Sequence, residues 1–492
     1  MKERSFYSNL FFSLGLNLLV KPAAIFIIDA AVQNEVGSEY GFYFAIFNLS
    51  LILSILFDFG VNNLSTKLAA QNIEAAKQQF SSIFIFRFAL MLFYITGLFC
   101  INLFIRLSWN DYLLILLLGL NQFLIANIAY FRSFFAGLHR FRLDALFSVL
   151  DRLLLIFSMG YILYVYPDGF KLVDIQTYAI LQFAGYGLTF LLAGLTLFKT
   201  IQPPLLLPNW QLIKTLVKTA FPYALLIVLM MLYTRSDAII LNWLAGVEAA
   251  SYYAQAFRLI DALYMFAMVF AGLLLPMFAR SLQYASHKDI KILTQQASKL
   301  LLGASITFIV FVFFHGSFFL DIIYPQNRVW LSDILLLLSI AFFGLASNLI
   351  YGSLLTANGS LKLLNKISAI GVVLNIGLNV WLLHKFPIFL QAIITPLVAA
   401  LTQLLMAAIQ RFYCYKLFNI RFSGKLFLQF MALTGMLVLW YLVVAFSPLG
   451  YSLSRSTLII LDVIMSFVCM TLLRLIDLKE LLKLLQNRDA MK

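Results

Sequence analysis

The chain alternates between long apolar runs and short polar stretches, and each apolar run has the length of a membrane-spanning helix. A helix needs about 20 apolar residues to cross the hydrocarbon core of a bilayer. The runs are uninterrupted, whereas the strands of a membrane barrel are about 10 residues long and alternate in polarity. The pattern therefore predicts an all-α membrane protein with about fourteen transmembrane helices, over residues 9–32, 41–61, 81–105, 112–136, 146–166, 177–198, 218–244, 252–279, 297–320, 330–357, 362–384, 389–417, 424–446 and 453–475.

Basic residues are concentrated in every second connection between these runs. One set of alternating loops and tails carries 23 Lys and Arg residues, and the other set carries five. Lys and Arg are enriched in the cytoplasmic loops of membrane proteins. The distribution predicts that both termini are cytoplasmic, which also requires an even number of spans.

The stretch IQPPLLLPNWQLIKTLVK separates six spans from eight. Its three prolines interrupt a helix, and the Trp and Lys residues that follow suit the headgroup layer of a membrane. We interpret residues 201–217 as a cytoplasmic linker with a short interfacial helix. The linker would join an N-lobe, 1–200 with helices 1–6, to a C-lobe, 218–417 with helices 7–12. Residues 418–492 would then hold helices 13 and 14 and a cytoplasmic tail.

Composition narrows the class further. The 492 residues are 63% hydrophobic and 11% charged, which is too apolar for a soluble domain. The formal charge of +14 is spread between the spans and not clustered as nucleic-acid binding requires. The three cysteines and four histidines have no spacing typical of a disulfide framework or a metal site. We therefore expect no nucleic acid, no metal and no cofactor.

Two connections carry nearly the same sequence. GSEYGFYFA at 37–45 and GVEAASYYA at 246–254 share Gly, Glu, Tyr and Ala at corresponding places, and each forms the first hairpin of its lobe. Many transporters are built from internal structural repeats. The similarity indicates two pseudo-symmetric lobes, although small and polar residues suit any short hairpin.

The stretch DAAVQNEVGSEYGFYFAIFNLS, followed by FDFGVNNLSTKLAAQN, resembles the opening hairpin of the polysaccharide transporters of the MOP flippase superfamily. RSDAIILNWLAGVEAASYYAQAFRL resembles the matching hairpin of the second lobe of these proteins, the Wzx-type O-antigen and capsule flippases. This chain has Asp29 near the end of its first span, where such proteins often carry Arg.

The resemblance implies two six-helix lobes, spans 1–6 and 7–12, around a central cavity, with two additional helices. It also implies a function. Such proteins move an undecaprenyl-diphosphate-type lipid-linked oligosaccharide from the inner to the outer leaflet of the bacterial cytoplasmic (inner) membrane by alternating access. The product would be O-antigen of lipopolysaccharide, capsule or exopolysaccharide. Membrane lipids, a polysaccharide polymerase and glycosyltransferases are the partners that this reading implies.

Several ionisable residues lie deep inside predicted spans. A charged side chain there costs roughly 2.5–3.5 kcal/mol, so it usually faces water or a partner. We interpret five basic residues as substrate-binding groups of a cationic cavity that suits a diphosphate: Lys21, Arg87, Arg152, Arg235 and Arg258. Asp237 and Asp261 are candidate ion-coupling sites, and Arg258 with Asp261 also fits a structural salt bridge three residues apart. Asp29, three residues from the end of its predicted span, we expect at the membrane interface.

Two other classes remain open. A MATE-like ion-coupled exporter of small molecules has a related architecture, typically with twelve spans. A membrane-embedded glycosyltransferase or polymerase usually needs catalytic carboxylates or a long outer loop, and the outer loops here are short. We therefore expect the protein not to be an enzyme.

Overall fold

The computed structural model describes residues 15–58, 61–105, 108–166, 168, 172–204, 208–283, 287–325, 330–420, 424–446 and 454–476, and all the regular structure in these ranges is helical. Within these described ranges, twelve helices are long and apolar enough to cross a membrane. Two shorter apolar helices, over Glu39–Ile55 and Thr457–Leu472, lie where the second and fourteenth spans are predicted. The all-α, multi-pass membrane fold is thus confirmed.

Contacts between residues divide the chain into two units. Unit 1 comprises Met1–Ala262 and Asn379–Ala392, and unit 2 comprises Leu263–Leu378 and Ile393–Lys492. The lobe boundaries expected from the sequence stay a prediction. They rest on the repeated hairpin motif, whereas the two units reflect contacts between residues.

In unit 1 the first predicted span changes its helical type along its length. Residues 15–23 are α-helical, η1 (Ala24–Asp29) is a π-helix, and α2 (Ala30–Val36) continues to the first hairpin. The π-helical segment begins two residues after Pro22, which cannot donate a backbone hydrogen bond. A π-helical insertion of this kind often occurs at functional sites.

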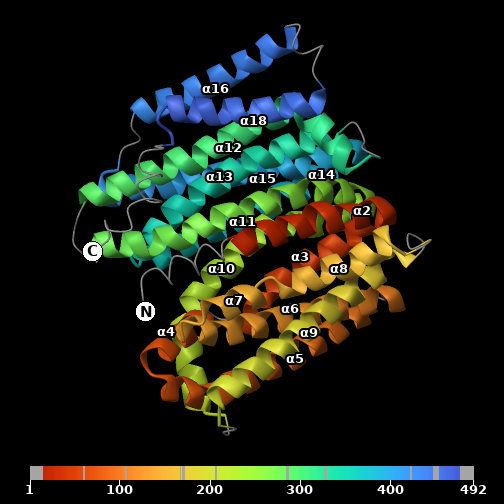
Figure 1. Cartoon of the computed structure of the whole chain (residues 1–492), viewed down its shortest axis with the longest axis vertical. Coiled ribbons are helices and arrows are strands. Elements are labelled where there is room, and N and C mark those ends of the chain that lie inside the picture. The colour runs from red at the N-terminus through yellow and green to blue at the C-terminus, as the bar shows by residue number, and fades with distance from the viewer. Residues whose placement is uncertain are drawn as a thin grey trace. The chain divides into compact units, whose positions relative to one another are not determined.

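The other helices of unit 1 pack around α6 (Trp109–Gly137). It contacts α3 (Glu39–Asp58), α4 (Val61–Gln71), α5 (Ile73–Ile105), α7 (Phe141–Phe147) and α9 (Ile175–Ile201). α8 (Leu150–Tyr164) packs on α9, and α10 (Trp210–Ala245) packs on α3. Figure 1 shows α5, α6 and α9 running alongside one another.

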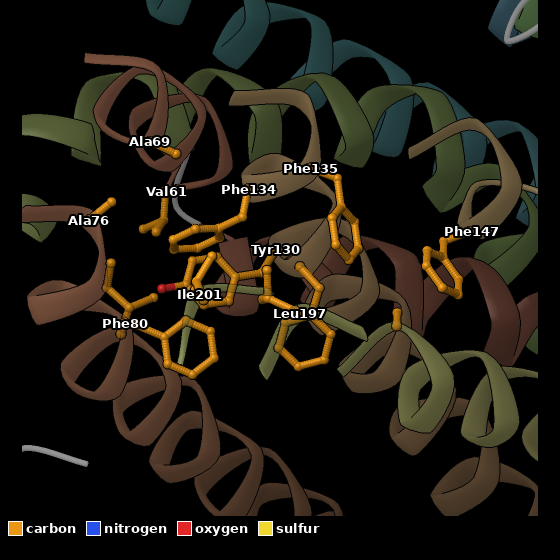
Figure 2. Close-up of a cluster of buried hydrophobic side chains, with 13 residues drawn as sticks. Val61, Ala69, Ala76, Phe80, Tyr130, Phe134, Phe135, Phe147, Leu197 and Ile201 are labelled. Atoms are coloured by element: carbon orange, nitrogen blue, oxygen red, sulfur yellow. The ribbon is translucent and has the colours of Figure 1, made fainter. Parts of the chain in front are cut away.

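An aromatic cluster ties several of these helices together (Figure 2). Phe80 of α5 stacks on Tyr130 of α6, with ring centroids 5.5 Å apart, and meets Phe134 edge to face. Leu197 of α9 completes the buried group. Aromatic pairs of this geometry contribute beyond the area that they bury, so this end of unit 1 is firmly packed.

Two elements differ from the sequence prediction. The polar segment after span two, VNNLSTKLAAQ, forms the separate helix α4. The expected interfacial helix of the linker is not separate, because α10 runs from Trp210 to Ala245 without a break and contains Pro222. The linker is fixed to α5, since Ser81 donates to the Pro204 carbonyl over 2.6 Å and Ser82 accepts from the Asn209 amide over 2.9 Å.

Unit 2 contains α12 (His287–Ile323) and α13 (Leu331–Ala357) and most of α11 (Val247–Gln283), α14 (Leu361–Lys385) and α15 (Ile388–Phe418). Its last two helices are α16 (Gly424–Phe446) and α18 (Arg455–Leu472). These two pack on each other and on α12, while α12 also packs on α13 (Figure 1).

The two similar hairpins of the sequence touch each other inside unit 1. The Ser251 hydroxyl donates to the Gly37 carbonyl over 3.0 Å. A β-carbon added to Gly41 would lie 2.0 Å from the Val247 carbonyl oxygen and 2.7 Å from the Ser251 nitrogen. Only glycine permits so close an approach of two helix backbones. The glycine of the first hairpin therefore determines how tightly α3 and α11 meet.

We predict that Gly41→Ala lowers the stability of the folded protein by at least about 2 kcal/mol, because the obstructing atoms belong to a backbone and cannot turn aside. Thermal unfolding of the purified protein in detergent measures this change. Gly97→Ala is the matched control, since a β-carbon at that helical glycine meets nothing within 4 Å. An unchanged unfolding midpoint for Gly41→Ala would contradict the close approach.

Candidate functional site

A group of charged side chains lies near the paired hairpins. Arg258 of α11 is at its centre. Its Nε donates to the Tyr40 hydroxyl over 3.0 Å and is 3.6 Å from Asp29 Oδ2. Its Nη1 is 3.8 Å from Asp261 Oδ2, one helical turn away. Arg258 thereby connects the first span to α3 and α11.

Arg235 of α10 joins the same group through Asp261. Its Nη2 is 2.8 Å from Asp261 Oδ1 and its Nη1 is 3.2 Å from Oδ2, which is a two-pronged pairing of guanidinium and carboxylate. Nη1 is also 3.5 Å from Asn48 Oδ1 on α3. Bidentate pairs are the geometry for which arginine is best suited. One carboxylate, Asp261, is thus shared by two guanidinium groups.

Aromatic rings cover both guanidinium groups. The Arg258 Cζ lies 4.6 Å from the ring centroid of Phe47 and 5.2 Å from that of Phe44. The Arg235 Cζ lies 5.0 Å from the ring centroid of Phe257. Cations are attracted to ring faces, most strongly where water is excluded, so these rings stabilise the positive charges without neutralising them.

Asp29 is buried between helices, and its position relative to the membrane interface stays a prediction. Only 3% of Asp29 is exposed, and it accepts a hydrogen bond from the Tyr178 hydroxyl of α9 as well as facing Arg258. The predicted span ended at residue 32, whereas the helix continues to Val36. Asp29 is consequently about one helical turn further from the end of its helix than the sequence pattern suggested.

Lys21 and Arg152 belong to a neighbouring set of charges in unit 1. Arg152 Nε is 3.3 Å from Asp151 Oδ2, and its Cζ lies 5.7 Å from the ring centroid of Tyr186. Lys21 interacts electrostatically with Asp151 and Arg152. Asp29 and Tyr178 interact electrostatically with Arg152, so the two sets of charges are in electrostatic contact.

Asp237 has a separate environment two residues from Arg235. Its carboxylate accepts hydrogen bonds from the Tyr253 hydroxyl over 3.2 Å and from the Asn379 amide over 2.9 Å, and only 1% of the residue is exposed. Arg235 and Asp237 take different partners, as their spacing on a helix predicts. Asp237 therefore links α10 to α11 and α14.

Arg87 is not brought into this group. Its Nη1 donates to the Ala126 carbonyl over 2.7 Å, its Nη2 donates to Asn62 Oδ1 over 2.9 Å, and its Cζ lies 4.6 Å from the Tyr130 ring centroid. The residue is 1% exposed, next to the aromatic cluster of Figure 2. These contacts of Arg87 connect α5 to α4 and α6.

The group includes residues that the charge pattern did not single out. Tyr40 lies within the repeated hairpin motif itself, and Asn48 follows it by two helical turns on α3. Tyr178 gave no signal, because a single Tyr in an apolar span is unremarkable. Among the described residues, no group of three or more His, Cys, Asp or Glu side chains is arranged to hold a metal ion.

The helical order and the fold match known membrane transporters. The fold is similar to that of the lipid II flippase MurJ in an inward closed conformation, with 16% identity, 97% of this chain and 99% of that chain covered, and a TM-score of 0.67. It is also similar to a multidrug resistance MATE family transporter in an inward-facing conformation, with 14% identity, 82% and 94% covered, and a TM-score of 0.63. A third similar structure is a MOP superfamily transporter from Pyrococcus furiosus, with 12% identity, 84% of this chain and 94% of that chain covered, and a TM-score of 0.55.

These similarities define the class, a multi-pass membrane protein with the fold of the MOP superfamily transporters. The model of the polysaccharide biosynthesis protein family matches residues 7–282, more than half of the sequence, and the chain belongs to that family. The resemblance drawn from the two hairpin motifs is therefore confirmed. No curated protein matches the chain in sequence.

We predict that Asp261→Asn lowers the free energy of unfolding by about 3 kcal/mol, because two poorly solvated guanidinium groups lose their shared counter-charge. The double variant Asp261→Asn/Arg235→Gln should recover part of the loss. A double-mutant cycle from thermal or denaturant unfolding measures the coupling.

The control for this cycle is Lys77→Gln, which breaks an exposed pair with Glu74. That change should cost less than about 0.5 kcal/mol. Strictly additive effects of the two substitutions in the cycle would mean that Arg235 and Asp261 do not interact.

Proposed function

We propose that this protein is a flippase for lipid-diphosphate-linked oligosaccharide repeat units, the precursors of O-antigen, capsule or exopolysaccharide. It would carry them from the inner to the outer leaflet of the bacterial cytoplasmic membrane, with both its termini cytoplasmic. Membership of the polysaccharide biosynthesis protein family supports the glycan part of the proposal. The similarity in fold to a lipid II flippase supports a lipid-linked cargo. No covalent chemistry is assigned to the protein.

The observation that carries the proposal is the pair of guanidinium groups that share Asp261 among apolar helices. Arg258 is 3.6 Å from Asp29 and 3.8 Å from Asp261, longer than an ideal ion pair, whereas Arg235 pairs closely with Asp261 at 2.8 Å. A diphosphate offers several oxygens of the kind that arginine binds in a bidentate way. The pair therefore suits the diphosphate of a lipid-linked sugar.

Binding by exchange of partners gives a transport mechanism. In the structure, Asp29 and Asp261 occupy donors of Arg258 and Arg235. A diphosphate that bound these donors would compete with both carboxylates and would weaken the link between the first span and α11. When the diphosphate left, the carboxylates would pair again. The substrate would thus bind more tightly to a conformation in which these helices are apart. A ligand can drive a conformational change only through such a difference in affinity.

The remaining basic residues have different roles in this proposal. We assign Lys21 and Arg152 to a second phosphate-binding position, because Arg152 interacts electrostatically with Asp29 of the main group and Lys21 interacts with Arg152. We assign Arg87 to packing, since its donors are used by Ala126 and Asn62.

Energy would come from an ion gradient through Asp237. The carboxylate is buried and accepts hydrogen bonds from two neutral groups, the Tyr253 hydroxyl and the Asn379 amide. Uptake of a proton or a metal cation there would remove the cost of the buried charge. Asp261 is the less suitable coupling site, because two arginines already compensate it.

A MATE-like exporter of small molecules is the second candidate, favoured by the similarity of the fold to a multidrug resistance transporter. That similarity covers 82% of this chain, whereas the similarity to MurJ covers 97%. A transporter with more spans than a typical exporter suits the larger cargo of the first proposal.

We predict that Arg235→Gln and Arg258→Gln each reduce flipping at least tenfold, because a diphosphate loses a bidentate donor worth about 1.5–3 kcal/mol. In cells that lack the native gene, each variant is supplied on a plasmid and the lipids are extracted. Sugar-loaded carrier should accumulate on the cytoplasmic leaflet.

Lys77→Gln, an exposed cation with the same change of charge, is the control and should restore export. Normal export by both arginine variants at normal protein levels would overturn the phosphate-binding role. Failure to export a small dye in place of the lipid would reject the exporter alternative.

We predict that Asp237→Asn leaves the protein folded and removes the dependence of flipping on the ion gradient. Asparagine is of similar size and can still accept from Tyr253, but it cannot take up a cation. The measurement compares export before and after an ionophore collapses the gradient, with the exposed Asp333→Asn as control. A variant that still responds to the ionophore as the unmodified protein does would exclude Asp237 as the coupling site.

A further inference from the structure

Unit 2 contains a second buried ionic group, which involves none of the residues considered so far. Asp462 of α18 and His315 of α12 face each other, with Oδ2 and Nε2 2.7 Å apart. The other carboxylate oxygen, Oδ1, accepts a hydrogen bond from the Trp440 indole nitrogen of α16 over 2.7 Å. Three helices thus meet at one carboxylate.

The surroundings of this carboxylate are aromatic. Asp462 is 1% exposed. Tyr441 stacks on Phe314 with ring centroids 4.6 Å apart, and the His315 ring lies 5.2 Å from the same tyrosine. Phe311 closes the other side of the histidine, with ring centroids 5.7 Å apart. The site is therefore poor in water, and charge at Asp462 has to be compensated locally.

The ionisable groups that face Asp462 among the described residues are few. His315 comes from α12, and Tyr441 comes from α16. Asp321 on α12 and Asp333 at the start of α13 are exposed and turned to the surroundings. A histidine is a cation only when it carries a second proton. The charge of the site consequently depends on a single proton.

The proton determines whether the buried group is neutral. With one proton shared between His315 and Asp462, the pair has no net charge, whichever of the two side chains holds it. Without that proton, a neutral imidazole faces a carboxylate, and one negative charge remains in an apolar interior at a cost of roughly 2.5–3.5 kcal/mol. Loss of the proton therefore favours any arrangement in which Asp462 reaches water.

We propose that His315 and Asp462 form a proton-binding site that fastens the C-terminal helix pair, α16 and α18, to α12. While the proton is bound, the pair and the Trp440 hydrogen bond hold the three helices together. When the proton leaves, α18 separates from α12. The path to the helix ends is short: His315 lies eight residues before the end of α12 and Asp462 seven residues after the start of α18, which is about 10–12 Å in each case.

The rival explanation is a fixed structural contact in which the proton plays no part. The two differ in one respect that can be measured. A proton-binding site makes the docking of the helix pair depend on pH through His315 and Asp462 together. A contact in which neither group gains or loses a proton between pH 5 and pH 10 contributes the same stability throughout that range.

The test uses the full-length protein in lipid nanodiscs, with thermal unfolding recorded from pH 5 to pH 10. The unmodified protein should lose about 5 °C in its unfolding midpoint as the pH rises through the range in which the pair loses its proton. Asp462→Asn is neutral beside a neutral histidine, so its midpoint should not show this fall. Trp440→Phe should lower the midpoint by a similar amount at every pH and keep the fall.

A second measurement follows the proton directly. The chain has four histidines, and the loss of one imidazole nitrogen resonance in His315→Gln identifies the signal of His315 in a protein labelled with nitrogen-15 at its histidines. That signal should change with pH together with the unfolding midpoint, and Asp462→Asn should displace it. If His315→Gln does not fold, the neutral double variant with Asp462→Asn serves instead.

The proposal is overturned if Asp462→Asn shows the same pH response as the unmodified protein, or if the His315 signal is insensitive to Asp462→Asn. Both measurements are independent of flipping. Their outcome therefore does not depend on the proposed transport function.

Discussion

The structure depends on one constraint, that a charge placed among apolar helices must be compensated by other side chains. Asp261 meets this constraint for two arginines at once, with Nη2 of Arg235 at 2.8 Å and Nη1 of Arg258 at 3.8 Å. Asp29 compensates Arg258 from the first span. Because these charges come from the first span, α10 and α11, their compensation also holds the three helices together. Removing one group leaves the others in an unfavourable environment.

The paired hairpins explain why the charges can meet. Gly41 allows α3 to approach the backbone of α11, and Ser251 fixes that approach by its hydrogen bond to Gly37. Tyr40 and Arg258, one from each helix, are then within 3.0 Å. The repeated sequence motif thus provides both a close contact of two helices and the first polar link between them. A link made of ion pairs is reversible, whereas the aromatic cluster around Phe80 and Tyr130 is a permanent contact.

The sequence predicted the fold well, because membrane spans are long and their apolar character is a strong local signal. It also located Arg235, Arg258 and Asp261, since charges in such spans are rare. It ended the first span at residue 32, whereas the helix continues four residues further, because the end of a span is the least certain part of a hydropathy pattern. It did not separate Arg87 from the other arginines, because the partners Ala126 and Asn62 are distant in sequence and depend on tertiary packing. The helix α4 was missed since its polar, short sequence resembles a loop.

The π-helical segment Ala24–Asp29 has a consequence for the direction of the side chain that ends it. A π turn contains one more residue than an α turn, so its backbone carries one residue in excess of the regular register. If the π turn shifted along the helix, the residues between its old and new positions would rotate by about 100° around the helix axis. Asp29 would then point away from α11, without any bending of the helix and without unfolding. The π-helical backbone of the first span therefore sets the direction in which Asp29 faces Arg258.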